Sequence, residues 1–363
     1  MKTVKTLIFL IIIALISSCY RDTGEFFRTT SITLSADNEE KRPGQTINLT
    51  IDTDSGLDVT SKSTFYIKEI IPTPTQILVS TNPTVTRATI SKYKVYAKYL
   101  DVNSQKEYVS NEIEINFDNK KSFRKRVLIE DYTGAWCVNC PTVSHAIELL
   151  KDKDVVPVAI HRGDNPASYD PYHFAGADPL EALVEIANQY PTAKLNRITD
   201  WNYPQHTQTN LNKAIALTTG TPVRVGLAMN STITGSTINL DVKVKFFDDF
   251  STSFRLVVYA LENDLIYPQK NSTSFYGGLS VIPNFQHDHV LRASFTNILG
   301  DAIPASVTFY DNVYSKNFSV TIPVNISNAS KIEFVAFVIG PDNKALNVRN
   351  SKVAVTQDFE ENN

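Results

Sequence analysis

Residues 31–117 alternate between apolar and polar side chains over several short segments. The clearest alternation is at residues 31–36, 45–52, 92–99 and 111–117. A period of two turns successive side chains to opposite faces of an extended chain, so each segment is predicted to be a strand with one buried face. Turn-forming pairs such as Pro43-Gly44 and Asn82-Pro83 separate the segments. We therefore predict a small β-sandwich of immunoglobulin-like type over residues 31–118.

The pattern changes at residue 126. Mostly apolar segments at 126–132 and 155–161 have the composition of buried strands, and residues 191–197 are predicted to form a third strand. Between and after them, apolar residues recur at helical spacing, as in Val143, Ile147 and Leu150. Further helices are predicted over 177–190, with Asp178 as the N-cap, and over 207–220. Strands that alternate with helices predict an α/β domain, which we place at residues 122–220.

Strand patterns return after residue 220. Five segments rich in Val, Ile, Leu, Phe and Thr lie at 221–230, 237–246, 254–263, 317–326 and 331–340. They predict a second immunoglobulin-like β-sandwich over residues 221–355. The predicted fold class is therefore multidomain α+β, with a central α/β domain between two β-sandwiches.

The first residues have the form of a secretory signal. Lys2 and Lys5 precede an apolar run at 7–16, which is too short to span a bilayer stably. The run leads into Ile-Ser-Ser-Cys, which resembles a bacterial lipobox. The resemblance implies a signal peptide at 1–18, acylation of the Cys19 thiol as a membrane anchor, and a tether at 19–30. The alternative is an ordinary signal peptide followed by an incidental cysteine.

Composition narrows the class of partner. Hydrophobic residues make up 42% of the chain and charged residues 20%, as in a folded protein. The formal net charge of −3 argues against a nucleic-acid partner, which requires a basic face. An exported chain also encounters an oxidising compartment, where its remaining two cysteines can form a disulfide.

Those two cysteines, Cys137 and Cys140, form a C-x-x-C motif between a predicted strand and a predicted helix. Backbone N–H groups and the dipole at a helix N-terminus stabilise a thiolate. Cys137 lies nearer the loop and is predicted to be the exposed nucleophile, while Cys140 is predicted to be the resolving thiol.

The residues around this motif resemble the thioredoxin-like superfamily. The resemblance rests on Trp136 directly before Cys137, on Asp131 in the preceding strand, on the order of strands and helices, and on Pro191 in a Tyr-Pro-Thr sequence. It implies that Asp131 accepts the proton of Cys140 and that Pro191 follows a cis bond and shapes a peptide groove. The dipeptide between the cysteines is Val-Asn and not Gly-Pro, so the resemblance implies no particular redox potential.

The chain as a whole resembles the outer-membrane lipoproteins of the 28-kilodalton type known from Bacteroidota. This resemblance rests on the lipobox, the C-x-x-C segment, the Tyr-Pro-Thr strand and the sequence His-Asp-His-Val-Leu-Arg at 287–292. It implies a location at the outer membrane, on its periplasmic or its cell-surface side.

Three hypotheses of function follow. The first is thiol–disulfide exchange on exported proteins or peptides, with no cofactor and no metal. The second is a cell-surface interaction or adhesion lipoprotein whose disulfide is structural. The third is a metal site made by the two cysteines with His145 or His161, although two thiols alone do not complete a zinc site.

Overall fold

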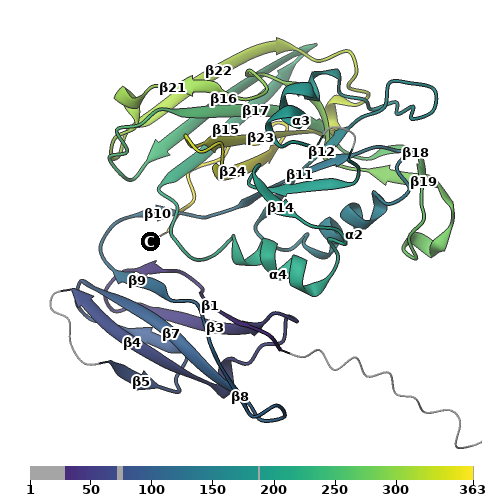
Figure 1. Cartoon of the computed structure of the whole chain (residues 1–363). Helices are drawn as coiled ribbons and strands as arrows, with labels where there is room; N and C mark the ends of the chain where they lie inside the picture. The colour runs from purple at the N-terminus through teal and green to yellow at the C-terminus, as the bar shows by residue number, and fades with distance from the viewer. Residues whose placement is uncertain (1–28, 72–76, 187–188, 363) are drawn as a thin grey trace, which may run out of the picture.

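A computed structural model describes residues 29–71, 77–186 and 189–362 (Figure 1). The predicted signal peptide and Cys19 lie outside these residues, as does most of the predicted tether. Among the described residues, no helix is long and apolar enough to cross a membrane.

The N-terminal part, residues 32–117, consists of two sheets around one apolar core. The smaller sheet has the order β1 (Ile32–Ala36), β3 (Thr46–Thr53) and β6 (Thr84–Thr86). The larger has the order β2 (Glu40–Lys41), β9 (Ile113–Phe117), β7 (Ser91–Asp101), β4 (Ser63–Ile71) and β5 (Leu78–Ser80), with β8 (Lys106–Val109) also on β7. Alternate residues of β7 are buried, as the alternation predicts.

The rest of the chain is built on one nine-stranded sheet. Its order is β14 (Thr199–Trp201), β13 (Thr192–Leu195), β11 (Val127–Thr133), β12 (Val155–His161), β20 (Val290–Ser294), β17 (Phe254–Glu262), β23 (Ile332–Ile339) and β24 (Ala345–Lys352), with β21 (Asp301–Ile303) paired to β17. The link between its halves is a parallel pairing in which Ala159 of β12 lies opposite Val290 of β20.

This sheet overturns the predicted fold class. A central thioredoxin-like α/β domain followed by a separate C-terminal sandwich is wrong, because strands from both predicted domains share one sheet. The described helices are also short: α2 (Pro141–Leu149), α3 (Asp178–Leu183) and α4 (Gln208–Ala216). Helix α3 ends well before the predicted residue 190, and Asp178 is its first helical residue, with Ala177 as the N-cap. The molecule is therefore mainly a β protein.

The two faces of the large sheet are covered differently. Helix α3 packs on one face, over apolar side chains of β11, β12, β17 and β23. The opposite face is covered at one end by α2 and α4. At its other end it is covered by a three-stranded sheet of β15 (Val225–Thr234), β16 (Thr237–Phe246) and β22 (Val313–Thr321).

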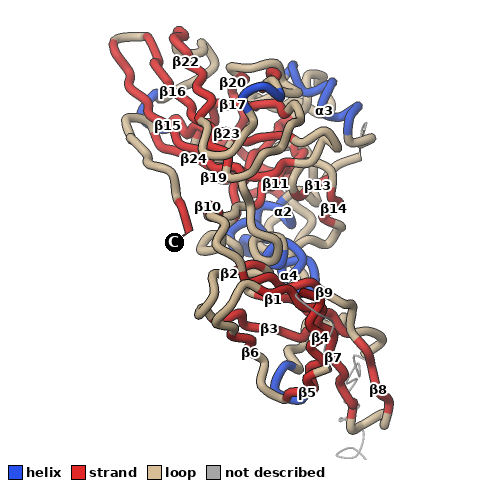
Figure 2. Tube along the Cα trace, turned by 90° about the vertical axis from the view of Figure 1, so that its left-hand side faces the viewer, coloured by secondary structure: helices blue, strands red, loops and turns tan. Residues whose placement is uncertain are grey.

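Two smaller pairs complete the structure. Strand β10 (Ser122–Phe123) pairs with β25 (Glu361–Asn362), so the end of the chain returns to the start of the large sheet. Strands β18 (Leu265–Lys270) and β19 (Val281–His287) form a hairpin. Figure 2 shows α4 between the N-terminal sheets and the large sheet, and the Thr209 hydroxyl donates a hydrogen bond to the carbonyl of Asp54 there.

Candidate functional site: the Cys137–Cys140 loop

The C-x-x-C motif lies in the loop between β11 and α2. Cys137 and Cys140 are joined by a disulfide, which confirms the predicted bond. Cys140 is the N-cap residue of α2, and Pro141 begins the helix where a missing N–H costs little. Gly134 opens the loop in a tight space, since an added Cβ would lie 2.8 Å from the carbonyl oxygen of Arg162. The strand, the glycine and the helix start together fix the position of the disulfide.

Both sulfur-bearing residues are buried. Cys137 is 4% exposed and Cys140 is 1% exposed. The predicted exposure of Cys137 is therefore wrong. A thiolate can attack only a disulfide that it can reach, so burial limits exchange.

The β18–β19 hairpin covers the loop through its polar groups. The Gln269 side-chain amide donates to the carbonyl oxygens of Cys137 at 2.9 Å and Gly134 at 3.3 Å. The backbone N–H of Lys270 donates to Ala135 at 2.9 Å, and that of Ser272 donates to Val138 at 2.7 Å. The loop is thus hydrogen-bonded to a segment that lies far away in sequence.

The Ser272 hydroxyl also donates to the side-chain oxygen of Asn139 at 2.6 Å. One residue of the Val138-Asn139 dipeptide is therefore in contact with the hairpin through its side chain, and the other through its carbonyl. These contacts could not be predicted from the sequence, because a local motif does not identify a distant partner.

Trp136 and Pro191 lie on the same side of the loop. The Trp136 indole N–H donates to the carbonyl of Arg162 at 2.7 Å, and its ring meets the ring of Tyr190 edge to face at 5.4 Å. The peptide bond between Tyr190 and Pro191 is cis. The structure thus brings Trp136 next to the Tyr-Pro segment. The predicted role of Pro191 in a peptide groove stays a prediction.

A buried contact between Asp170 and His161 supports the loop. The Asp170 carboxylate accepts a hydrogen bond from the Ala135 backbone N–H at 2.7 Å and contacts His161 Nδ1 at 2.8 Å. Burial opposes ionisation of Asp170, but His161 and the backbone donors outweigh it and lower its pKa on balance. Asp170 therefore stabilises the loop as a carboxylate.

The histidines of the metal hypothesis have other partners. His161 pairs with Asp170, and the ring of His145 stacks on Phe275 with ring centres 4.0 Å apart. In the described part of the chain, no group of three or more His, Cys, Asp or Glu residues is arranged to hold a metal ion.

Asp131 lies on the α2 face of β11. It is 2% exposed, and its Oδ1 has no hydrogen-bond partner. Burial raises the pKa of Asp131 to about 8, so the carboxyl group is protonated at neutral pH. The transfer of a proton between this group and Cys140 stays a prediction.

Glu130, the adjacent residue, faces the other side of the sheet. It is fully buried and pairs with Arg197, with Arg197 Nη2 2.9 Å from its Oε1. The same nitrogen donates to the Tyr259 hydroxyl at 2.9 Å, and the guanidinium lies 4.9 Å from the ring centre of Phe337. Arg197 was not predicted to be the partner of Glu130. The signal that could have identified it is Glu130 itself, because a buried carboxylate requires a cation.

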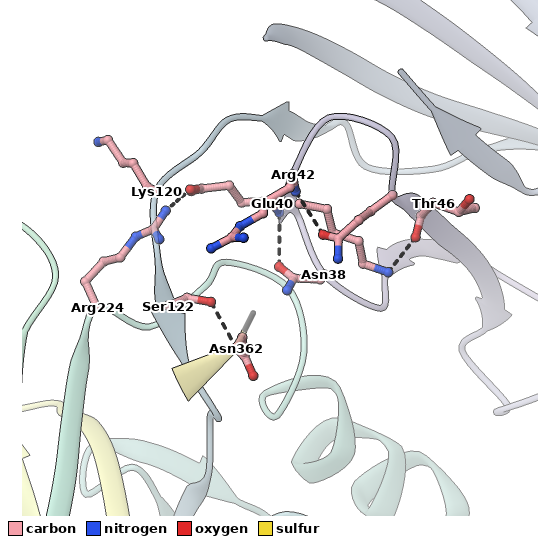
Figure 3. Close-up of a pocket in the computed structure, with 10 residues that line it drawn as sticks. Asn38, Glu40, Arg42, Thr46, Lys120, Ser122, Arg224 and Asn362 are labelled. Carbon is pink, nitrogen blue, oxygen red and sulfur yellow. Dashed lines mark hydrogen bonds and ion pairs between the residues drawn. The ribbon is translucent and has the colours of Figure 1, made fainter. Parts of the chain in front are cut away.

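A cavity of about 440 Å³ lies at the junction of the N-terminal sheets and the rest of the molecule (Figure 3). Its cations mostly have partners: Arg224 pairs with Glu40, and Lys41 pairs with Asp37. Ser122 and Asn362 are also hydrogen-bonded to each other, at 3.0 Å. The Arg224–Glu40 pair joins the two parts of the protein, and we interpret this cavity as a structural junction.

Comparison with known proteins gives one family match. Residues 184–357 match the model of the family described as outer membrane protein Omp28. The match covers most of the large sheet and the β18–β19 hairpin, but it does not include Cys137 and Cys140. No curated protein matches the chain.

Among solved structures, HBP35 of Porphyromonas gingivalis matches 66% of this chain and 78% of its own chain, at 18% sequence identity and a TM-score of 0.49. That likeness is too weak to carry an argument about this protein. The comparisons do not support the resemblance to the thioredoxin-like superfamily. Residues 184–357 are similar to the Omp28 family of outer membrane proteins, and this similarity confirms the predicted location at the outer membrane.

Proposed function

We propose that the protein is an interaction protein of the outer membrane, anchored through Cys19, in which the Cys137–Cys140 disulfide is structural. The observation that carries the proposal is the cover over the disulfide. Both cysteines are buried, and Gln269, Lys270 and Ser272 donate hydrogen bonds to the loop between Gly134 and Asn139. Burial and these hydrogen bonds limit the access of a substrate thiol to the disulfide.

The family match supports the same proposal. It spans the sheet and the hairpin that covers the disulfide, and it leaves out the cysteines themselves. What the chain shares with its family is therefore a framework, and the disulfide fastens one loop to that framework.

A candidate contact site for a partner is the edge strand β5. Its residues Leu78 and Val79 are 50% and 55% exposed, and β5 ends the order of its sheet. An exposed edge strand offers unpaired backbone groups to a strand of another chain. Apolar side chains beside those groups favour a protein partner.

The contact can be tested in intact cells with a photo-reactive residue in place of Val79. The matched control carries the same residue in place of Lys151, which is exposed in the turn after α2. We expect a discrete crosslinked product from position 79 and none from position 151. Equal, diffuse labelling from both positions would contradict the assignment of β5.

Thiol–disulfide exchange is the second candidate, and one observation favours it. Asp131, on the strand that leads into the loop, holds a proton at neutral pH that could pass to a leaving thiolate. The two candidate functions predict different rates of insulin reduction by the full chain. The structural proposal predicts equal, background rates for the wild type and Cys137→Ser, and a rate that depends on Cys137 would favour exchange.

A further inference from the structure

A second cavity of about 440 Å³ lies beside the Cys137–Cys140 loop, between the large sheet, α2 and the β18–β19 hairpin. Its floor is one face of β11 and β12. The register places Asp131 opposite Ala159, and Ile129 opposite Pro157. The small side chain of Ala159 leaves space beside the carboxyl group. The cavity has the volume of a small-molecule site.

The floor of this cavity contains a polar group without a partner. Asp131 is 2% exposed, and its Oδ1 accepts no hydrogen bond within the described structure. Nearly all buried polar groups in proteins are paired, because leaving one unpaired is costly. A partner from outside the chain would remove this cost.

Acidic side chains line the cavity together with Asp131. Helix α2 contributes Glu148 and strand β12 contributes His161, while Gln269 of β18 adds only an amide. The segment after β19 contributes Asp288. Among the described residues that line the cavity, none is Lys or Arg. Of the acidic groups in the described lining, Glu148 pairs with Lys151 outside the cavity at 2.7 Å, whereas Asp131 and Asp288 form no ion pair.

The two other histidines do not change this balance. Burial lowers the pKa of His287 to about 3, so its ring is neutral at neutral pH. His289 pairs with Glu333 at 2.8 Å, and His161 pairs with Asp170, so each imidazole has a carboxylate partner of its own. Apart from these pairs, the side chains in the cavity that can carry a charge at neutral pH are carboxylic acids.

Aromatic rings form another wall. Tyr276 and Phe285 line the cavity and meet edge to face, with ring centres 5.2 Å apart. The faces of such rings attract cations. The cavity in Figure 3 has the same volume but is lined by Lys41, Arg42 and Arg224, so it has the opposite character.

We propose that the cavity beside the disulfide binds a small organic cation, a protonated amine with a short apolar body, whose ammonium group pairs with the unpartnered carboxyl of Asp131 between the carboxylates and the aromatic wall. The ammonium keeps its own proton. Asp131 gives up its proton to solvent when the pair forms, so binding below pH 8 releases about one proton per ligand. The proposal does not depend on whether the disulfide is structural or catalytic.

The test is calorimetry of the full chain with its disulfide intact, using benzylammonium chloride and n-pentylammonium chloride as probes. Benzyl alcohol is the neutral counterpart. At pH 7, titration in two buffers with different ionisation enthalpies measures the protons released. We expect at least one ammonium probe to bind with release of about one proton, and its affinity to rise about tenfold per pH unit from pH 6 to pH 7.

Two variants make the test specific. Asp131→Asn keeps the shape of the side chain and removes its charge, and we expect it to weaken ammonium binding at least tenfold. Asp164→Asn, at an exposed position in the loop after β12, is the matched control and should bind like the wild type. Circular dichroism verifies that both variants are folded.

Three results would overturn the proposal. The first is that neither ammonium probe binds. The second is that benzyl alcohol binds as tightly as benzylammonium. The third is that ammonium binding to the wild type releases no proton, a result that does not depend on how Asp131→Asn folds.

Discussion

Two neighbouring carboxyl groups on strand β11 point to opposite faces of the sheet and lie in opposite environments. Glu130 faces β17 and β23, where Arg197 and Tyr259 complete a buried ion pair. Asp131 faces α2 and a cavity, and one of its oxygens has no partner. A buried carboxylate that has a cation partner fixes the structure around it, whereas a buried carboxyl group that has none is a place where a ligand can bind. The comparison assigns a structural role to one face and a binding role to the other.

The largest effect is expected on the paired face. Replacing Arg197 with Met leaves Glu130 buried without a cation, which typically costs about 3–5 kcal/mol. Urea unfolding measures the loss. The control is Lys151→Met, which removes an exposed pair with Glu148 and should change the stability little. Similar small losses in both variants would show that the Glu130–Arg197 pair does not hold the sheet together.

On the other face, the stability of the protein should depend on pH through Asp131. Its folded pKa is about 8, above the value of about 3.9 for an unfolded chain, so the unfolded state loses its proton first. This contribution is complete below pH 4 and falls by about 1.4 kcal/mol per pH unit until pH 8.

Unfolding free energies at pH 5, 6 and 7 test this dependence. Asp131→Asn has no proton to lose, so it should lack this part of the slope. The difference between the wild type and the variant should therefore change by about 3 kcal/mol from pH 5 to pH 7. Parallel pH profiles would mean that Asp131 is ionised and paired in the folded protein.

Removal of the disulfide is expected to have a smaller effect. The bond closes a short loop, residues 137–140, and loop-closure entropy for four residues corresponds to about 2 kcal/mol. The double variant Cys137→Ser, Cys140→Ser should remain folded and lose about that amount in thermal or urea unfolding. Complete unfolding would show that the bond supports much more than its own loop.

The smallest effect concerns the cover of the loop. Gln269→Ala removes the hydrogen bonds to Cys137 and Gly134, which should cost about 1 kcal/mol and expose the disulfide. Dithiothreitol should reduce this variant faster than the wild type. The control is Gln286→Ala, on the same hairpin but exposed and bonded to Asp264 and Asp288. Equal reduction rates for all three proteins would contradict the role of the hairpin.

Local patterns in the sequence predicted local structure well. The alternation in residues 92–99 corresponds to β7, and the apolar spacing after Cys140 corresponds to α2. The pairing of β12 with β20 could not be predicted in this way, because it joins segments that are far apart in the chain and each is compatible with many partners. The predicted domain boundary after residue 220 failed for that reason.

The same distinction between local and tertiary features applies to the candidate site. The C-x-x-C motif and the preceding strand located the disulfide and Asp131. The cover provided by Gln269 and Ser272 could not be predicted, because amide and hydroxyl side chains are common on strands and loops and their partners depend on the tertiary fold. Burial of the cysteines, which decides between exchange and a structural bond, is a tertiary property.

The most direct test of a structural disulfide is the reduction potential of Cys137–Cys140 in the full chain. The protein is equilibrated with dithiothreitol buffers of known reduction potential and then alkylated. Mass measurement of the alkylated protein gives the potential of the disulfide. The account predicts a potential below about −300 mV, as in disulfides that resist reduction. A value between about −270 and −120 mV, the range of exchange proteins, would contradict it.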